Sequence, residues 1–262
     1  MPASSRFPLH GAVAVVTGAS SGLGRRFCLD LAAAGSVVVG LARRAELLEE
    51  LEGPLRAHSP ESSTRRCDVT DTDAFTGLLA EVEEGRGRID LLVNDAGVGE
   101  ARGETGLEPH RRVMETNYFA AVAGTLAVLP GMTGRRHGAV VNVSSDSGRA
   151  PGPNEPAYGA SKAALSAFTE SMAMKVEGTG VRLHVLYPGW VPTDMGAGAV
   201  ADGMPTPPRF VRRTEEQVSR LLLARIGGPR VDIDAAGAAR LAPVARALFP
   251  GLYRRGMRAA GG

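Results

Sequence analysis

The chain has 262 residues, 44% of them hydrophobic and 22% charged, and its mean hydropathy of −0.04 is that of a globular protein. A net charge of only +2 gives no sign of nucleic-acid binding. The apolar runs are far shorter than a bilayer span, the first residues lack the apolar region of a signal peptide, and no His/Cys cluster has metal-ligand spacing. We therefore expect a cytoplasmic enzyme without a membrane span or a metal site.

Short apolar strands alternate with amphipathic helices along the chain. We predict, in order, a strand at residues 12–17, a helix at 23–34, a strand at 37–41, a helix at 45–51, a strand at 64–69, a helix at 71–84, a strand at 89–94, a helix at 108–129, a strand at 139–143, a helix at 156–176, a strand at 181–187 and a helix at 214–225. Gly53-Pro54 is expected to stop the second helix, and the third strand, the least apolar, is expected at an edge. The pattern predicts a single α/β domain with a three-layer, doubly wound parallel sheet of the Rossmann-like type.

Two segments interrupt this alternation. Residues 188–213 are rich in Gly and Pro, and a loop of this length is usually a functional lid or disordered, so we place a substrate lid at about residues 190–213. Residues 234–262 are expected to form a tail of one or two short helices with an apolar face. We interpret its arginines, Arg254, Arg255 and Arg258, as a solvated end of that tail.

A glycine-rich loop, TGASSGLG, joins the first strand to the first helix. Gly18 can make the tight turn, Gly22 can let the backbone approach a pyrophosphate, and Gly24 can let the helix pack on the strand. The helix N-terminus adds free N–H groups for an anion, and Ser20 and Ser21 add hydroxyls. A plain turn is the alternative, but the position after the first strand favours a dinucleotide site.

The second strand is followed by Ala42-Arg43-Arg44 and has no carboxylate at its end. An enzyme that uses NAD places a carboxylate there for the ribose 2′-hydroxyl, whereas guanidinium groups suit a 2′-phosphate. Both arginines could instead be solvated residues at a helix start. We predict NADP(H) as the cofactor, with NAD(H) as the alternative.

Tyr158 and Lys162 lie four residues apart at the start of a helix and therefore share one face. A cation one turn away favours the phenolate and lowers the pKa of a tyrosine. Only two of the 30 basic residues are lysines, which suggests a role for Lys162 that arginine cannot fill. Thirteen residues before Tyr158, Ser145 ends a strand, where a hydroxyl could hold a substrate oxygen or simply cap a turn.

Taken together, these motifs resemble the short-chain dehydrogenase/reductase family. The resemblance covers about residues 10–230. It is carried by TGASSGLG (17–24), Asp68-Val69, NDAG (94–97), Asn117, the strand end VNVSS, YGASK (158–162) and PGWVPT (188–193). It implies one NADP(H)-binding oxidoreductase domain over residues 1–262.

The resemblance also implies roles for individual residues. Tyr158 is expected to be the general acid that protonates a carbonyl oxygen, Ser145, rather than Ser144, to orient that oxygen, and Lys162 to bind the nicotinamide ribose and lower the pKa of Tyr158. Asn117 is expected to bend its helix and hold a water of the proton relay. Besides Tyr158 and Lys162, the expected cofactor contacts are Gly18, Ser20, Ser21, Gly22, Leu23, Gly24, Arg43, Arg44, Asp68, Val69, Asn94, Ala96, Gly97, Pro188, Gly189, Val191 and Thr193.

The chain departs from the family pattern in two places. Asp95 replaces the second Asn of the usual Asn-Asn-Ala-Gly, which puts the bracing of the neighbouring strand in doubt. The common C-terminal motifs are absent, and only residues 230–233 could supply a last strand. We therefore expect a homodimer or homotetramer, with a dimer through helices 108–129 and 156–176 favoured.

The predicted function is the NADP(H)-dependent interconversion of a ketone or aldehyde and an alcohol by hydride transfer, with a small carbonyl or alcohol molecule as substrate. A 3-oxoacyl-carrier-protein reductase is an alternative and would need a basic docking patch. Four arginines could form that patch: Arg102, Arg111, Arg112 and Arg149. A non-catalytic NADP-sensing protein is a third possibility, but it would typically lack Tyr158 or Lys162.

Overall fold

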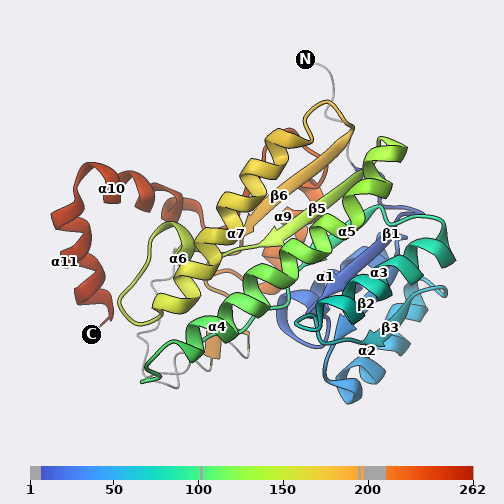
Figure 1. Ribbon diagram of the computed structural model, residues 1–262, viewed down its shortest axis with the longest axis horizontal. Helices are drawn as coiled ribbons and strands as arrows, with labels where there is room; N and C mark the ends of the chain where they lie inside the picture. The colour runs from blue at the N-terminus through green and yellow to red at the C-terminus, as the bar shows by residue number, and fades with distance from the viewer. Residues whose placement is uncertain (1–6, 101–102, 194–195, 198–210, 262) are drawn as a thin grey trace.

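The computed structural model describes residues 7–100, 103–193, 196–197 and 211–261, which contain one seven-stranded sheet (Figure 1). The strands are β1 (Val13–Thr17), β2 (Val37–Ala42), β3 (Ser63–Arg66), β4 (Leu91–Asn94), β5 (Gly138–Val143), β6 (Val181–Tyr187) and β7 (Asp232–Asp234). All pairs are parallel, and the order is β3-β2-β1-β4-β5-β6-β7. The predicted doubly wound parallel sheet is confirmed, including the edge position of the third strand.

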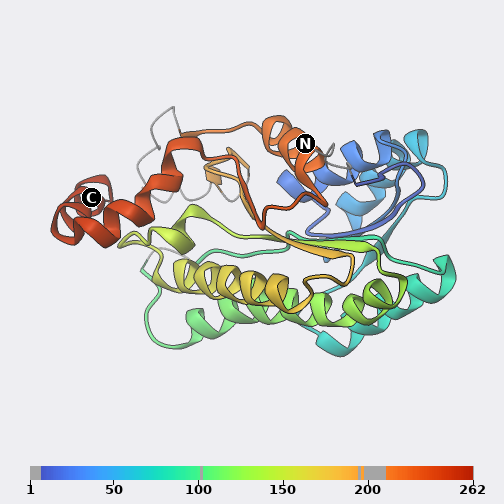
Figure 2. The same cartoon turned by 90° about the horizontal axis from the view of Figure 1, so that it is seen from above.

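Helices cover both faces of the sheet, as Figure 2 shows from above. Between β1 and β6 lie α1 (Gly22–Ala33), α2 (Ala45–His58), α3 (Thr72–Arg86), α4 (Glu108–Met114), the π-helical turn η1 (Glu115–Phe119), α5 (Ala120–Arg135), α6 (Asp146–Arg149) and α7 (Pro156–Lys175). After β6 come α9 (Glu215–Arg225), η3 (Gly237–Leu241), α10 (Ala242–Leu248) and α11 (Pro250–Gly261). The sheet topology changes direction between β1 and β4, where ligands of such folds bind beyond the carboxyl ends of the strands.

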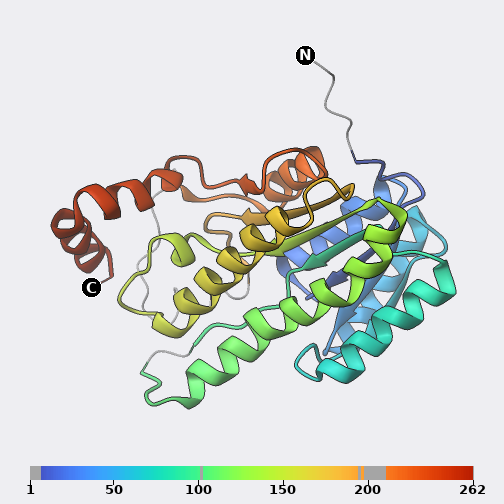
Figure 3. The same cartoon turned by 45° about the horizontal axis from the view of Figure 1, so that its top comes forward.

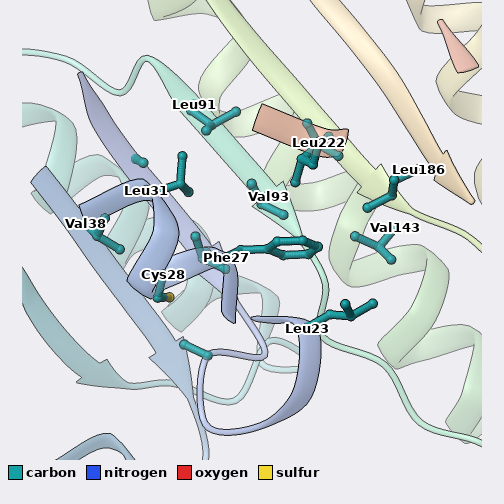
Figure 4. Packing of buried hydrophobic residues seen from close by; sticks show 14 of the residues in the cluster. Leu23, Phe27, Cys28, Leu31, Val38, Leu91, Val93, Val143, Leu186 and Leu222 are labelled. Carbon is teal, nitrogen blue, oxygen red and sulfur yellow. The ribbon is translucent and has the colours of Figure 1, made fainter. Parts of the chain in front are cut away.

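Each face of the sheet has its own apolar core. On one face, α1, α2 and α9 pack against the strands, and Phe27 of α1 is fully buried between Val93 of β4 and Leu222 of α9 (Figure 4). On the other face, α3 and α5 bury Phe75 and Met132. Burial of such side chains stabilises the fold by roughly 1.5–3 kcal/mol each. Packing in these two cores holds α1 and α5 against the sheet, with their first turns near the carboxyl ends of the strands, where a ligand would bind.

The prediction that Gly53-Pro54 stops the second helix is wrong, because α2 continues to His58. Leu51 and Leu55 lie one turn apart and are both fully buried, so packing favours continuation of the helix. Pro54 is exposed, and the residue before it is a glycine, which has no Cβ to clash with the proline ring. The burial of Leu51 and Leu55 therefore outweighs the tendency of Gly53-Pro54 to end a helix.

The predicted helix at 108–129 is longer and less regular than expected. It runs as α4, η1 and α5 to Arg135, beyond the exposed Pro130, because Met132 is fully buried. The short helix α6 after β5 was not predicted. The segment at 230–233 does supply the last strand, β7, which pairs with β6.

The C-terminal helices η3, α10 and α11 match the predicted tail. Most of the proposed lid, residues 194–195 and 198–210, lies outside the described residues. Among the residues that the structure describes, we find no helix with the length and apolar character to cross a bilayer.

Two glycines of α3 offer a test of the helix assignment. Gly77 lies inside α3 with open space around it, so Gly77→Ala should raise the free energy of unfolding by about 1 kcal/mol. Gly87, which ends the same helix at φ +73° and also has open space, is the matched control. Gly87→Ala should lower the free energy of unfolding by roughly 1 kcal/mol. Urea unfolding of both variants measures this, and a stabilising Gly87→Ala would contradict the assigned helix end.

Candidate active site

The glycine-rich loop after β1 has the close contacts that the sequence predicts. Gly18 has φ +74°, and a Cβ there would lie 2.9 Å from the backbone nitrogen of Ala96 in the loop after β4. A Cβ on Gly24 would lie 2.4 Å from the carbonyl oxygen of Gly18. Because no side chain fits at either position, the loop turns tightly and α1 begins directly at the switch point.

The N-terminus of α1 is suited to an anion. Ser21 occupies the N-cap position and makes no side-chain capping hydrogen bond, so the first N–H groups of α1 keep their binding capacity at the positive end of the helix dipole. Gly22 has φ +55°, and a Cβ there would lie 3.0 Å from the methyl group of Thr193. A backbone cradle of this kind fits the pyrophosphate of a dinucleotide, with Leu23 in its first turn.

Both arginines after β2 lie close to this cradle. The guanidinium of Arg44 donates to the hydroxyls of Ser20, at 2.9 Å, and Ser21, at 2.6 Å. Arg43 is exposed and lies 3.9 Å from the carboxylate of Asp68, which follows β3. Two cations thus lie at the end of β2, the position from which the ribose of an adenine nucleotide is recognised.

Three of the residues expected to contact the adenosine part of the cofactor, Asp68, Val69 and Ala96, lie near one another. Burial alone would raise the pKa of Asp68, but hydrogen bonds from the N–H and hydroxyl of Thr70 and the charge of Arg43 lower it, so the carboxylate is ionised. Val69 and Ala96 line one small hollow together with Thr17. These residues border the space on the β3 side of the glycine-rich loop.

Asn94 braces the sheet with its side chain. Its amide donates to Asn142 Oδ1, at 2.8 Å, and to the carbonyl oxygen of Ala121, at 3.2 Å, so only its main chain can face a cofactor. The bracing that the change to Asp95 put in doubt is supplied by Thr17. Its hydroxyl accepts hydrogen bonds of 3.1 Å from the backbone nitrogens of both Asp95 and Ala96.

Asp95 and Lys162 form an interacting pair beneath the cradle. The carboxylate of Asp95 lies against the first turn of α1, where a Cβ on Gly24 would come within 2.8 Å of its Oδ2. Lys162 is 4% exposed, and its Nζ donates to the carbonyl oxygen of Val143 at 2.7 Å. Burial raises the pKa of Asp95 and lowers that of Lys162, and the attraction between the two charges offsets part of each shift.

Tyr158 and Ser145 meet at the carboxyl end of β5. Ser145 caps α6, where its hydroxyl accepts from the backbone nitrogen of Ser147 at 3.2 Å, and its polar interaction with the phenol lowers the pKa of Tyr158. Lys162 Nζ lies 5.7 Å from the centre of the Tyr158 ring. The hydroxyl, the phenol and the ammonium therefore share one site, contributed by β5 and α7.

The expected lowering of the Tyr158 pKa is not what this arrangement produces. Burial and the negative charges of Glu155, Asp95 and Asp146 raise the pKa of Tyr158, and the polar interaction with the Ser145 hydroxyl offsets only part of this rise. Lys162 Nζ donates to the carbonyl oxygen of Val143. The phenol is consequently held protonated, the form that a proton donor requires.

The choice between the two serines agrees with the geometry. The Ser144 hydroxyl is 2% exposed and bonds to Lys162 O, at 3.0 Å, and to Ser166 Oγ, at 2.8 Å, so it joins β5 to α7. Only Ser145 is directed at Tyr158.

Asn117 lies within the π-helical turn, as the expected bend requires. Its amide donates to Val98 O at 2.9 Å and to Ser161 Oγ at 3.0 Å, and its Oδ1 accepts from the Val98 nitrogen at 2.8 Å. A Cβ on Gly97 would lie 3.3 Å from Asn117 Oδ1 and 3.6 Å from Lys162 Nζ. Asn117 thus fixes the loop after β4 beside Lys162. Single π-turns of this kind are frequent at functional sites.

The loop after β6 closes the opposite side of the cradle. Gly189 has φ +73°, and Val191 is buried with the core around α1, while Thr193 contacts Gly22. Pro188 precedes this turn and is buried. Trp190 packs beside Arg212, and its indole nitrogen is buried without a hydrogen-bond partner among the described residues.

Two polar groups near the site were missed from the sequence. Glu155, just before α7, accepts from the Ser147 hydroxyl at 2.6 Å, and burial raises the pKa of its carboxyl group. Its position three residues before Tyr158 was an available signal.

The second missed group joins the ends of three strands. Arg149 makes 2.8 Å ion pairs with both Asp146 and Asp234, and its guanidinium lies 3.5 Å above the ring of Tyr187. The spacing of three residues could have suggested the pair of Asp146 and Arg149, but only the fold brings Asp234 and Tyr187 to them.

The remaining reactive side chains are structural. His184 is fully buried and bonds through both ring nitrogens, to Arg230 O and to the Gly227 N–H. Cys28 and Cys67 are free and buried. In the described part of the chain, no group of His, Cys, Asp and Glu could hold a metal ion.

Comparison with known proteins agrees with this geometry. The family model described as short chain dehydrogenase matches residues 12–203. Dehydrogenase/reductase SDR family member 7B of Bos taurus is 39% identical over 94% of this chain and 80% of its own length. A short chain dehydrogenase of Pseudocercospora fijiensis is 40% identical over 72% of this chain, a match that spans 62% of that protein.

Solved structures give the same result. A short chain dehydrogenase/reductase from Burkholderia phymatum, in complex with NAD, superposes with a TM-score of 0.83. It is 26% identical, and the match covers 95% of this chain and 97% of that protein.

Proposed function

This chain belongs to the short-chain dehydrogenase/reductase family, and on that premise we propose that it interconverts a ketone or aldehyde and an alcohol with NADP(H). The observation that carries the proposal is the meeting of Ser145, Tyr158 and Lys162 at the carboxyl edge of the sheet, beside a glycine cradle. Oxidation of NADPH with a panel of ketones and aldehydes tests it, and the absence of turnover with every class of carbonyl would contradict it.

The cradle fits a nicotinamide dinucleotide. Gly18 and Gly22 let the loops after β4 and β6 approach the glycine-rich backbone, because a Cβ at Gly18 would meet Ala96 and one at Gly22 would meet Thr193. The first turn of α1 supplies N–H groups for the pyrophosphate. Arg43 and Arg44 would hold a 2′-phosphate, and Lys162 would hold the nicotinamide ribose. When bound, the cofactor supplies the hydride.

The chain's own residues supply position and a proton. The Ser145 hydroxyl would hold the carbonyl oxygen of the substrate next to the Tyr158 phenol, with which it interacts in this structure. Negative charge develops on that oxygen during reduction, and the protonated phenol can transfer its proton there. Lys162, held by Val143, would keep a positive charge beside this exchange. In the reverse direction Tyr158 takes the proton from the alcohol.

The alternative of a carrier-protein-linked reductase has less support. Arg111 and Arg112 pair with Glu108 and Glu104, and Arg149 is held between two carboxylates, so these cations are already neutralised locally. The fourth arginine of the expected patch, Arg102, lies outside the described residues. A small free carbonyl substrate is therefore the better proposal.

We also propose a homo-oligomer through the long helices. Phe119 of η1 is 48% exposed and Leu126 of α5 is 49% exposed. A second copy could cover such side chains, as expected for a dimer through the helices at 108–129 and 156–176.

The cofactor preference is testable by kinetics. The kcat/KM with NADPH should exceed that with NADH by about tenfold or more, because a hydrogen bond to a charged group contributes about 1.5–3 kcal/mol. Replacing both Arg43 and Arg44 by alanine should remove this preference. The control is Arg56→Ala, because Arg56 lies on α2 and pairs with Glu52. Equal kcat/KM values in the unmodified protein, or a preference for NADH, would show that the arginines serve another purpose.

A further inference from the structure

The C-terminal helices stand apart from the layered body, on the side where α4 and α6 lie (Figures 1 and 3). Two hydrogen bonds tie them to the loop after α6. The hydroxyl of Tyr253 donates to Pro151 O at 2.9 Å, and Arg246 donates to Arg149 O at 3.4 Å. The tail is therefore attached beside the segment that leads from Ser145 to Tyr158.

The tail exposes several large apolar side chains together. We define the tail patch by five residues that are 52–72% exposed: Leu241, Val244, Leu248, Phe249 and Leu252. Val244 and Leu248 lie four residues apart on one face of α10, and Leu241 is the residue that caps its start. Contiguous exposed groups of this kind mark interaction sites rather than ordinary surface.

The charge of the tail has a single sign. Asp234 is the last acidic residue of the chain, and five arginines follow it: Arg240, Arg246, Arg254, Arg255 and Arg258. On α11, Arg254, Arg255 and Arg258 are exposed on one face, whereas Tyr253 and Met257 are partly buried on the other. An apolar patch flanked only by cations complements a surface that is both apolar and anionic.

We propose that the tail patch docks this protein on the surface of a bilayer that contains anionic lipids. An amphipathic helix of this type lies in the plane of the interface, with its apolar residues among the acyl chains and its arginines at the phosphates. A second copy of the chain fits less well, because a symmetric contact would bring two sets of arginines together. The mode is peripheral and adds no membrane-spanning segment.

Docking also bears on the substrate, in an inference that rests on the proposed function. Because Tyr253 binds the loop after α6, a docked tail would bring the carboxyl edge of the sheet close to the lipid surface. The substrate class that fits this placement is a carbonyl compound or alcohol dissolved in the membrane. Vesicle binding is measured without any activity, so its failure would leave the proposed reaction untouched.

The test is flotation of the full chain with vesicles of phosphatidylcholine alone or mixed with phosphatidylglycerol. We expect binding to the mixed vesicles that weakens as salt is raised, and little binding to neutral ones. Leu248→Glu and Leu252→Glu should each reduce the bound fraction about tenfold or more. Ala224→Glu, at an exposed residue of α9 outside the proposed oligomer interface, is the matched control and should bind normally. Arg254→Gln and Arg255→Gln together should remove the preference for anionic lipid, whereas Arg220→Gln on α9 should not.

Three outcomes would overturn the proposal: no binding to either vesicle, equal loss in the Ala224→Glu control, or an oligomer in solution that Leu248→Glu dissociates. The last would assign the tail patch to a second copy of the chain. Thermal unfolding of each variant verifies that the fold is unchanged.

Discussion

Tyr158→Phe is expected to lower kcat by at least about a hundredfold, the low end for general acid–base catalysis, while NADPH binding changes little. Phenylalanine keeps the ring and removes only the hydroxyl that interacts with Ser145. A hundredfold loss corresponds to about 2.7 kcal/mol of transition-state stabilisation. None of the histidines offers a substitute, since His184, the one buried in the sheet, bonds through both ring nitrogens.

Steady-state kinetics measures the expected fall in kcat, and fluorescence titration measures NADPH binding. Tyr118→Phe is the matched control, because the Tyr118 ring packs edge-on against Phe119 and Phe168. A Tyr158→Phe variant with near-normal kcat would mean that the proton comes from another group. A variant that loses NADPH binding as well would indicate a disturbed pocket instead.

The raised pKa of Tyr158 gives this prediction a pH dependence. Because burial and Glu155 favour the neutral phenol, the proton donor for reduction is present throughout the neutral range. The reverse reaction requires the tyrosine to accept a proton, so oxidation of an alcohol should accelerate as the pH rises. The sequence alone suggested the opposite shift, because it showed the nearby lysine but not the carboxylates that surround the phenol.

The parts of the fold predicted correctly from the sequence are those set by local chemistry. Glycines at 18, 22 and 24 leave few other conformations for a strand-to-helix turn, and the alternation of apolar runs fixes a parallel sheet. The choice of Ser145 over Ser144 also agrees with the geometry, because their side chains point to different neighbours.

What the sequence could not provide depends on contacts between distant segments. Arg149 of α6 forms an ion pair with Asp146 of the same helix and another with Asp234 of β7. Asp234 lies 85 residues further along the chain than Arg149. The passage of α2 through Gly53-Pro54 depends on the burial of Leu55 against the rest of the core. Local signals predicted a stop there, and tertiary packing overrode them.

Asp95 illustrates the same limit at the site itself. Its place in the NDAG motif predicted only a weaker brace for the strand. The fold puts its carboxylate at the first turn of α1, facing Lys162, where it holds the lysine's charge in place. In the sequence, Asp95 only replaces an asparagine and loses its amide donors, whereas in the fold its carboxylate interacts with the charge of Lys162.

Lys162→Ala is expected to lower kcat and to weaken NADPH binding, each by about tenfold or more, so that kcat/KM falls by about a hundredfold or more. The ammonium is buried, donates to Val143 and lies beside both Tyr158 and the glycine cradle, so its loss affects the phenol and the cofactor together. Lys162→Arg should restore activity only in part, because a planar guanidinium cannot occupy the site of a compact ammonium. Lys175, the other lysine of the chain, is exposed at the end of α7, so Lys175→Ala is the matched control and should behave normally.

The charge of Lys162 can also be tested through Asp95. Because Asp95 raises the pKa of Lys162, the Asp95→Asn variant should have a lower Lys162 pKa, and the alkaline limb of its kcat/KM profile should move to lower pH. Full activity in Lys162→Arg, or an alkaline limb that moves to higher pH in Asp95→Asn, would show that the charge of this lysine is not what the site uses.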